Sequence, residues 1–171
     1  LFAEYLASRP MVDPYSDSDY FAHIDGRPRF DGVAALLASR GIQLPWGTPE
    51  DPPEAHTVCG LGLRKNLGFE RLLQREGIAP YPGSLRLVKQ LHAAGTKLAV
   101  VSSSRNATEV LRLAGIDRYF PVVVDGRVAE EDGVPGKPAP DMYVHAASKL
   151  GVERARAVVL EDAVSGVQSG A

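Results

Sequence analysis

The chain of 171 residues is 44% hydrophobic and 23% charged, proportions typical of a globular protein rather than of a disordered or fibrous one. Its formal net charge of −2 argues against a nucleic-acid-binding surface, because phosphate backbones attract strongly basic surfaces. No apolar run approaches the roughly 20 residues that a transmembrane helix needs, and the single cysteine, Cys59, excludes an internal disulfide and fits a reducing compartment. We therefore expect a cytoplasmic protein that binds neither nucleic acid nor membrane.

Residues 1 to about 79 are predicted to form helices separated by polar loops, without a strand. Apolar residues recur at helical spacing over 31–40, and Gly41 follows them as a typical helix terminator. Four prolines between positions 45 and 53 predict an irregular connection. A second long helix is expected from about 54 to 76, interrupted by its glycines.

After residue 80 the pattern changes to helices that alternate with short apolar, β-branched strands. The predicted order is helix, strand, helix, strand, helix and strand, over 81–95, 97–101, 106–115, 121–124, 141–151 and 157–160. Asn106 and Glu109, three residues apart, resemble a capping box at the start of the second of these helices. Strands connected through helices favour a parallel α/β sheet with right-handed crossovers, so we expect part of a doubly wound core over residues 80–171.

In sheets of this kind the ligand site lies beyond the carboxyl ends of the strands. The polar residues that leave those ends, or lie in the loop before the last unit, are Ser102, Ser103, Ser104, Arg105, Asn106, Asp125, Lys137, Glu161 and Asp162. A hydroxyl, a lysine and two adjacent carboxylates are therefore predicted to converge on one edge of the sheet.

The adjacent acids Glu161 and Asp162 would repel each other unless a cation lies beside them. Oxygen ligands of this kind are preferred by Mg²⁺, commonly together with a substrate phosphate. Lys137 and Ser102 would supply donors for phosphate oxygens, which is the charge stabilisation that phosphoryl transfer requires. The simpler alternative is that the two acids begin a helix and that residues 102–104 form an ordinary polar turn.

The stretches VVSSS, GKPAPD and VVLEDAVSGV resemble the second, third and fourth motifs of the haloacid dehalogenase-like hydrolase superfamily. Together with YPGSLRLVKQL and SSSRN, they make the chain similar to the β-phosphoglucomutase-like group, whose members carry a helical cap inserted into an α/β core. The resemblance implies a cap domain over residues 1–79 and a partial doubly wound parallel-sheet core over 80–171. It extends over nearly the whole chain.

The resemblance also implies roles for the residues at the predicted sheet edge. Ser102 would hydrogen-bond the transferring phosphoryl group, and Lys137 would offset its charge. Asp162 would ligate Mg²⁺, with Glu161 as a direct or water-mediated partner. The residues that would contact a second phosphate or the sugar are Ser103, Ser104, Arg105 and Asn106.

Two segments of the first half resemble the cap of the same group. HIDGRPRFDGV is similar to the stretch that carries a phosphate-binding arginine, here Arg29, and GLRKN is similar to a substrate-contacting segment, through Lys65 and Asn66. A guanidinium grips phosphate with two parallel hydrogen bonds, which suits the distal group of a sugar phosphate. The alternative for these three residues is that they are solvated surface side chains.

The first motif of the superfamily is missing from the printed sequence. That motif is an Asp-x-Asp loop after an apolar strand, and it supplies the aspartate that becomes phosphorylated. The stretch DSDY at 17–20 has the letters, but its surroundings are polar and helical, and no apolar strand precedes it. We therefore expect the chain to be part of a longer protein and to be inactive alone.

The residues and the resemblance together predict that the intact protein is a Mg²⁺-dependent phosphotransferase that acts on a small sugar phosphate, with a phosphoglucomutase favoured. A sugar-phosphate phosphatase is the enzymatic alternative. A non-catalytic module that binds a phosphorylated ligand or a partner subunit is the alternative from another class. A receiver domain, which also combines carboxylates, a hydroxyl and a lysine, is disfavoured because it would have no helical cap.

Overall fold

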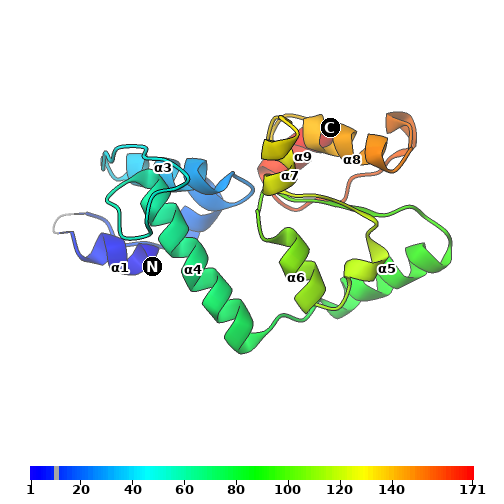
Figure 1. Ribbon diagram of the computed structural model, residues 1–171, viewed down its shortest axis with the longest axis horizontal. Coiled ribbons are helices and arrows are strands. Elements are labelled where there is room, and N and C mark those ends of the chain that lie inside the picture. The colour runs from blue at the N-terminus through cyan, green and yellow to red at the C-terminus, as the bar shows by residue number, and fades with distance from the viewer. Residues whose placement is uncertain (10–11) are drawn as a thin grey trace. The chain divides into compact units, whose positions relative to one another are not determined.

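The computed structural model describes residues 1–9 and 12–171 and contains two compact units, Leu1–Arg75 and Glu76–Ala171 (Figure 1). The predicted boundary between residues 79 and 80 lies a few residues after this division. Within the described part of the chain, no helix has the length and apolar character needed to cross a membrane.

The first unit consists of helices joined by loops. Its helices are α1 (Phe2–Ala7), α2 (Asp17–Asp19), the π-helix η1 (Tyr20–Ile24), α3 (Arg29–Ser39) and α4 (Val58–Glu76). Their apolar faces meet in a core formed by Phe2, Val33, Leu36, Leu37, Val58 and Leu61. Helix α3 ends as predicted just before Gly41, whose φ of 67° lies in the left-handed region that favours glycine. Cys59 is fully buried, as expected of a small apolar side chain.

Two glycines were expected to interrupt α4, and this prediction is wrong. The helix is continuous from its first turn, where the Thr57 hydroxyl accepts the N–H of Gly60 at 2.9 Å. A Cβ at Gly60 would lie 2.5 Å from the carbonyl oxygen of Ala55, and a Cβ at Gly62 would lie 2.8 Å from the ring of Phe30. Close packing against these groups offsets the low helix propensity of glycine, so the glycines allow α4 to pack rather than breaking it.

The DSDY stretch is helical, as its polar surroundings predict. Asp19 is buried, and both of its carboxylate oxygens lie 2.7 Å from Nη2 of Arg40. Hydrogen bonds from Arg40 and from the backbone of Ser16 hold the pKa of Asp19 below its ordinary value. Asp19 is therefore a structural ion-pair partner that joins α2 to the end of α3.

The second unit combines a small parallel sheet with helices. Its elements are α5 (Pro82–Ala93), β1 (Ala99–Val101), α6 (Ala107–Leu113), the 3₁₀ helix η2 (Asp117–Tyr119), β2 (Val122–Val124), α7 (Gly126–Glu131), α8 (Asp141–Lys149), the 3₁₀ helix η3 (Arg154–Arg156) and α9 (Val164–Gly170). The strands pair in parallel, with Ala99 opposite Val122 and Val101 opposite Val124. Two of the predicted strands, and their parallel pairing across a helix, are thus confirmed.

Helices α7 and α8 cover the sheet. Helix α8 packs on both strands and α7 packs on β2. The buried core between them is formed by Val124, Ala129, Met142 and Ala146. Parallel strands covered by helices appear in sequence as short continuous apolar runs, which is why β1 and β2 were predictable.

The third predicted strand, over 157–160, does not form. The sheet of the described residues contains β1 and β2 alone, and Val158 and Leu160 are 87% and 74% exposed. Apolar β-branched residues favour a strand, but a strand exists only where its backbone groups pair with a neighbour. Because no neighbouring strand pairs with residues 157–160, this segment is irregular despite its strand propensity.

The predicted capping box at α6 is also wrong. Asn106 directly precedes the helix, but its side chain makes no capping hydrogen bond. Glu109 pairs instead with Arg112, at N–O distances of 2.8 and 2.6 Å. Two charge-assisted bonds to a guanidinium one turn later outcompete a single bond to a backbone N–H.

Candidate active site

The loop after β1 is a succession of serine turns. Oγ of Ser102 accepts the N–H of Ser104 at 3.1 Å, and Oγ of Ser104 accepts the N–H of Asn106 at 3.2 Å. Serine favours such turns because its short hydroxyl competes for nearby backbone groups. Each hydroxyl still has its own proton to donate, so Ser102 presents a donor at the carboxyl end of β1.

Helix α7 holds this loop from the end of the neighbouring strand. The N–H of Gly126 donates to the carbonyl of Ser104 at 3.1 Å, and Arg105 forms an ion pair with Glu130. Asp125 is 1% exposed, and its carboxylate accepts two backbone N–H groups of α7 at 3.0 Å each. Asp125, which the sequence placed at the sheet edge, is therefore the N-cap of α7.

Lys137 lies at the carboxyl end of β1 with its side chain only 5% exposed. Its ammonium group donates to Oε2 of Glu161 at 2.5 Å and to the carbonyl of Val101 at 3.4 Å. The same ammonium group lies 5.0 Å from the centre of the Tyr143 ring. Lysine is almost never buried without a partner. These contacts hold the Lys137 ammonium group beside Val101, the residue before Ser102.

The Glu161 carboxylate is hydrogen-bonded to several other groups of the site. Its Oε2 also accepts the hydroxyl of Tyr143 at 2.5 Å, and its Oε1 accepts the N–H groups of Asp162 and Ala163 at 3.2 and 3.1 Å. Burial alone would raise the pKa of Glu161, but the hydrogen bonds from Lys137 and Tyr143 outweigh it and lower the pKa to about 2. Glu161 is therefore a carboxylate at neutral pH.

Tyr143 was missed by sequence reasoning. Burial raises the pKa of its phenol far above the ordinary value, and the Glu161 carboxylate adds to the effect, so the phenol keeps its proton and donates it. The hydrogen bond joins residues 18 positions apart. Such a contact leaves no local pattern, and in the sequence Tyr143 looks like any residue on a helix face.

A glycine in α9 makes room for the Glu161 carboxyl group. A Cβ at Gly166 would lie 2.2 Å from Cδ of Glu161. Because the carboxyl group is held by Lys137 and Tyr143, it cannot swing away from an added side chain. The glycine in VVLEDAVSGV thus follows from the position of Glu161.

Asp162 differs from Glu161 in its exposure and in its hydrogen bonds. It is exposed, and within the described chain its carboxylate has no hydrogen bond or ion pair. An exposed carboxylate fits Mg²⁺, whereas the four acceptor positions of Glu161 are already taken. Over residues 1–9 and 12–171, no group of three or more His, Cys, Asp or Glu side chains is arranged to hold a metal ion. The described residues thus offer a divalent cation one open carboxylate at this place, that of Asp162.

The three residues predicted in the cap come together in the first unit. Nη2 of Arg29 donates to Oδ1 of Asn66 at 2.8 Å, although they are 37 positions apart. The other side of the amide is fixed by Glu70, whose Oε1 accepts Nδ2 of Asn66 at 2.7 Å. Arg29 begins α3 and Asn66 lies on α4, so the packing of the two helices creates this contact.

Lys65 lies next to this pair. Its Nζ is 5.6 Å from the centre of the Phe69 ring. Burial and then the positive charge of Arg29 lower the pKa of Lys65. The positive charges of Lys65 and Arg29 are therefore close enough to influence each other within the first unit.

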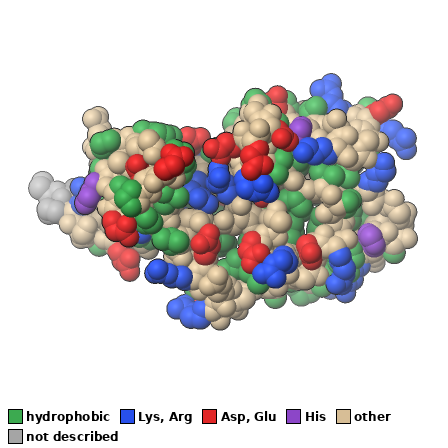
Figure 2. Space-filling model, viewed as in Figure 1, with side chains coloured by type: hydrophobic (Ala, Val, Ile, Leu, Met, Phe, Trp, Pro, Cys, Tyr) green, Lys and Arg blue, Asp and Glu red, His purple; other side chains and the backbone are tan. Residues whose placement is uncertain are grey.

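The predicted residues thus fall into two groups, one in each unit. Arg29, Lys65 and Asn66 are gathered in the first unit, and Ser102, Lys137 and Glu161 in the second, with Asp162 adjoining Glu161. On the face drawn in Figure 2, acidic and basic side chains are interspersed, as the net charge of −2 suggests.

A family model described as haloacid dehalogenase-like hydrolase matches residues 18–171 of the chain. A relative named beta-phosphoglucomutase, from Mycobacterium bovis, is 44% identical over 178 residues, which cover 99% of this chain and 67% of the relative. The match includes the sheet, the serine loop and the helical unit.

Solved structures agree with this assignment. CbbY from Rhodobacter sphaeroides, in complex with xylulose-(1,5)-bisphosphate, has a TM-score of 0.72 and 25% identity, covering 99% of this chain and 72% of that one. Beta-phosphoglucomutase from Clostridium difficile has a TM-score of 0.74 at 20% identity, covering 96% and 69%, and supports the fold. The fold is the α/β fold with a helical cap, as the sequence predicts.

Proposed function

The chain belongs to the haloacid dehalogenase-like hydrolase family, and we propose that it serves a Mg²⁺-dependent phosphotransferase of the β-phosphoglucomutase type, acting on a small sugar phosphate. The observation that carries this proposal is the Lys137–Glu161 ion pair at the carboxyl end of β1, beside Ser102 and the exposed Asp162. A buried cation, a hydroxyl donor and an exposed carboxylate are the groups that a transferring phosphoryl group requires.

In the proposed reaction an aspartate outside the printed residues receives the phosphoryl group. The P–O bond to the sugar breaks as a P–O bond to the aspartate carboxylate forms. Ser102 would orient the group through its O–H, and Lys137 would offset its negative charge. Mg²⁺ bound at Asp162 would supply further charge neutralisation. Water or a sugar hydroxyl would then take the phosphoryl group from the aspartate.

The Asp-x-Asp stretch at 17–19 lies in helix α2 and does not follow a strand, which supports a nucleophile elsewhere. Its second acid, Asp19, is buried and paired with Arg40, so its carboxylate is not accessible to a phosphate. The Asp-x-Asp pattern after an apolar strand is otherwise missing from the printed sequence.

The cap group would bind the distal part of the substrate. Arg29 would grip a second phosphate, and Lys65 and Asn66 would contact the sugar or the same phosphate. The sugar bisphosphate in the Rhodobacter sphaeroides structure supports a substrate of this class, and the Mycobacterium bovis relative favours a mutase. A sugar-phosphate phosphatase is the enzymatic alternative, favoured by the hydrolase description of the family.

The deciding experiment is turnover of α- and β-glucose 1-phosphate by the full-length protein with Mg²⁺. Formation of glucose 6-phosphate from one anomer supports the mutase. Release of free phosphate without isomerisation supports the phosphatase. If neither product forms from any sugar phosphate tested, the non-catalytic alternative replaces both.

A further inference from the structure

Helix α4 of the first unit (Figure 1) carries three residues at four-residue spacing that are linked to Arg29. Gly62, Asn66 and Glu70 lie about one turn apart and therefore share one side of the helix. A Cβ at Gly62 would be 3.4 Å from Cγ of Arg29, so the aliphatic part of the arginine packs against α4 at this glycine. The guanidinium at its end then meets the next residue of the series, Asn66.

Asn66 bridges a cation and an anion. Its Oδ1 accepts Nη2 of Arg29 at 2.8 Å, and its Nδ2 donates to Oε1 of Glu70 at 2.7 Å. A side-chain amide has one acceptor end and one donor end. A half-turn of the amide would therefore place its donors against the guanidinium and its oxygen against the carboxylate, and both contacts would be repulsive. Two charged partners thus fix the orientation of the Asn66 amide.

Glu70 is the last residue of this hydrogen-bonded series. Its side chain is half-buried, and the bond that it accepts from Asn66 is charge-assisted, which makes it stronger than a bond between neutral groups. Without the carboxylate the amide would lose one of the two bonds that orient it, and its contact with Arg29 would loosen. A guanidinium grips a phosphate through two parallel hydrogen bonds only when its plane points at the phosphate, so its orientation matters for binding.

We propose that Glu70 is a positioning residue for the cap arginine: through the Asn66 amide it holds the Arg29 guanidinium in the orientation that grips the distal phosphate of the substrate. Neither GLRKN nor the other segments that suggested site residues contain Glu70. The role in substrate binding rests on the proposed function, whereas the hold on Arg29 can be measured without any substrate.

The first test follows the Nη signals of Arg29 in the ¹⁵N-labelled full chain by nuclear magnetic resonance. In wild type these signals should be separate, because a guanidinium held by hydrogen bonds rotates slowly. Glu70→Ala should keep α4, since alanine is the best helix former, but should merge the signals into one. Glu70→Gln should leave them separate, because its amide oxygen can still accept the N–H of Asn66. Merged signals in wild type, or separate ones in Glu70→Ala, would overturn the proposal.

The second test measures steady-state kinetics of the full-length protein with glucose 1,6-bisphosphate, which keeps one phosphate while the other is transferred, and with a minimal aryl phosphate. Glu70→Ala should raise KM for the bisphosphate about threefold or more at nearly unchanged kcat, because a bond that orients the binding arginine is lost. KM for the aryl phosphate should not change, and Glu70→Gln should behave as wild type. A lower KM in Glu70→Gln would show that the carboxylate acts through its charge, which would refute a positioning role.

Gln74→Ala is the matched control, because Gln74 is exposed one turn further along α4. It should change neither the Arg29 signals nor KM, and an effect equal to that of Glu70→Ala would contradict the proposal. If the full-length protein turns over no sugar phosphate while Glu70→Ala still merges the Arg29 signals, the proposed function fails and the hold of Glu70 on Arg29 stands. Turnover together with signals that Glu70→Ala leaves separate would refute the role of Glu70 and keep the proposed function.

Discussion

The ammonium group of Lys137 lies 2.5 Å from the carboxylate of Glu161, although 24 positions separate them in the chain. This ion pair joins the GKPAPD loop to the VVLEDAVSGV segment at the carboxyl end of β1. Both side chains are largely buried, so each compensates a charge that would otherwise be costly in this place.

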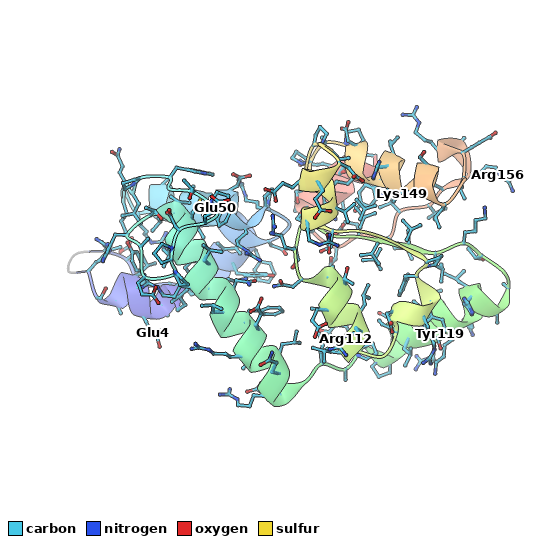
Figure 3. All side chains as sticks on the ribbon, in the orientation of Figure 1. Glu4, Glu50, Arg112, Tyr119, Lys149 and Arg156 are labelled. Atoms are coloured by element: carbon cyan, nitrogen blue, oxygen red, sulfur yellow. The ribbon has the colours of Figure 1, made fainter. Side chains whose placement is uncertain are left out.

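Truncation of Lys137 should therefore destabilise the fold. Lys137→Ala leaves the Glu161 carboxylate buried without its cation, and we expect the free energy of unfolding to fall by about 3 kcal/mol. Urea titration followed by circular dichroism measures this. The control is Lys149→Ala, at the end of α8 (Figure 3), because Lys149 pairs with Asp132 at the surface and should contribute less than about 1 kcal/mol. Equal losses in the two variants would contradict the argument.

Gly166 should be intolerant of alanine. The added Cβ would lie 2.2 Å from Cδ of a Glu161 side chain that Lys137 and Tyr143 hold in place, so we expect a loss of more than about 1 kcal/mol. Gly68→Ala is the control, since Gly68 lies in α4 with open space around its Cβ position. It should be neutral or stabilise by up to about 1 kcal/mol through helix propensity. Stabilisation by Gly166→Ala would show that the Glu161 carboxyl group can move.

The Asp19–Arg40 pair predicts how stability depends on pH. Its hydrogen bonds lower the pKa of Asp19 in the folded state, so its stabilising contribution is complete above the ordinary value of 3.8 and is lost as the pH falls below it. Melting temperatures between pH 2 and 6 should therefore fall more steeply in wild type than in Asp19→Asn, at roughly the pH of an unperturbed carboxyl group.

Glu109→Gln is the matched control for that experiment. Glu109 also has two hydrogen bonds to an arginine, but its pair with Arg112 is exposed to solvent on both sides. Solvent screens such a pair, so this variant should follow the wild-type pH profile closely. If the melting temperature of Asp19→Asn falls with pH in parallel with that of wild type, the Asp19–Arg40 pair does not contribute to the pH dependence of stability.

Arg29 is predicted to act on the distal group of the substrate. In the full-length protein, Arg29→Ala should raise KM for a hexose phosphate or bisphosphate about tenfold or more, with little effect on a minimal aryl phosphate. Arg71→Ala is the control, because Arg71 lies exposed on α4. Equal effects of Arg29→Ala on both substrates would exclude Arg29 from the substrate site.

Asp162 is predicted to be indispensable for metal-dependent turnover. Asp162→Asn in the full-length protein should abolish Mg²⁺-dependent activity while the thermal unfolding transition stays within a few degrees of wild type, because the side chain is exposed. Asp117→Asn, an exposed acid of η2, should retain activity. Near-normal activity of Asp162→Asn would refute its metal role.

Much of this protein is determined by local sequence. Helix α3 stops before Gly41 and α5 begins at Pro82, because a left-handed φ and a ring-fixed φ are properties of single residues. The strands β1 and β2 follow from short β-branched runs. Ser102 could be selected as a candidate because it leaves the carboxyl end of β1, whereas Asp162 was selected beside a predicted strand that does not form.

The features that depend on a partner far away in the sequence were decided only by the tertiary structure. The run 157–160 has strand residues but no paired neighbour, and α4 continues through its glycines because Ala55 and Phe30 pack against them. The hydrogen bond from Tyr143 of α8 to Glu161 likewise joins residues 18 positions apart. Conformational preferences are encoded residue by residue, whereas pairing, close packing and hydrogen-bond competition depend on which surfaces the fold brings together.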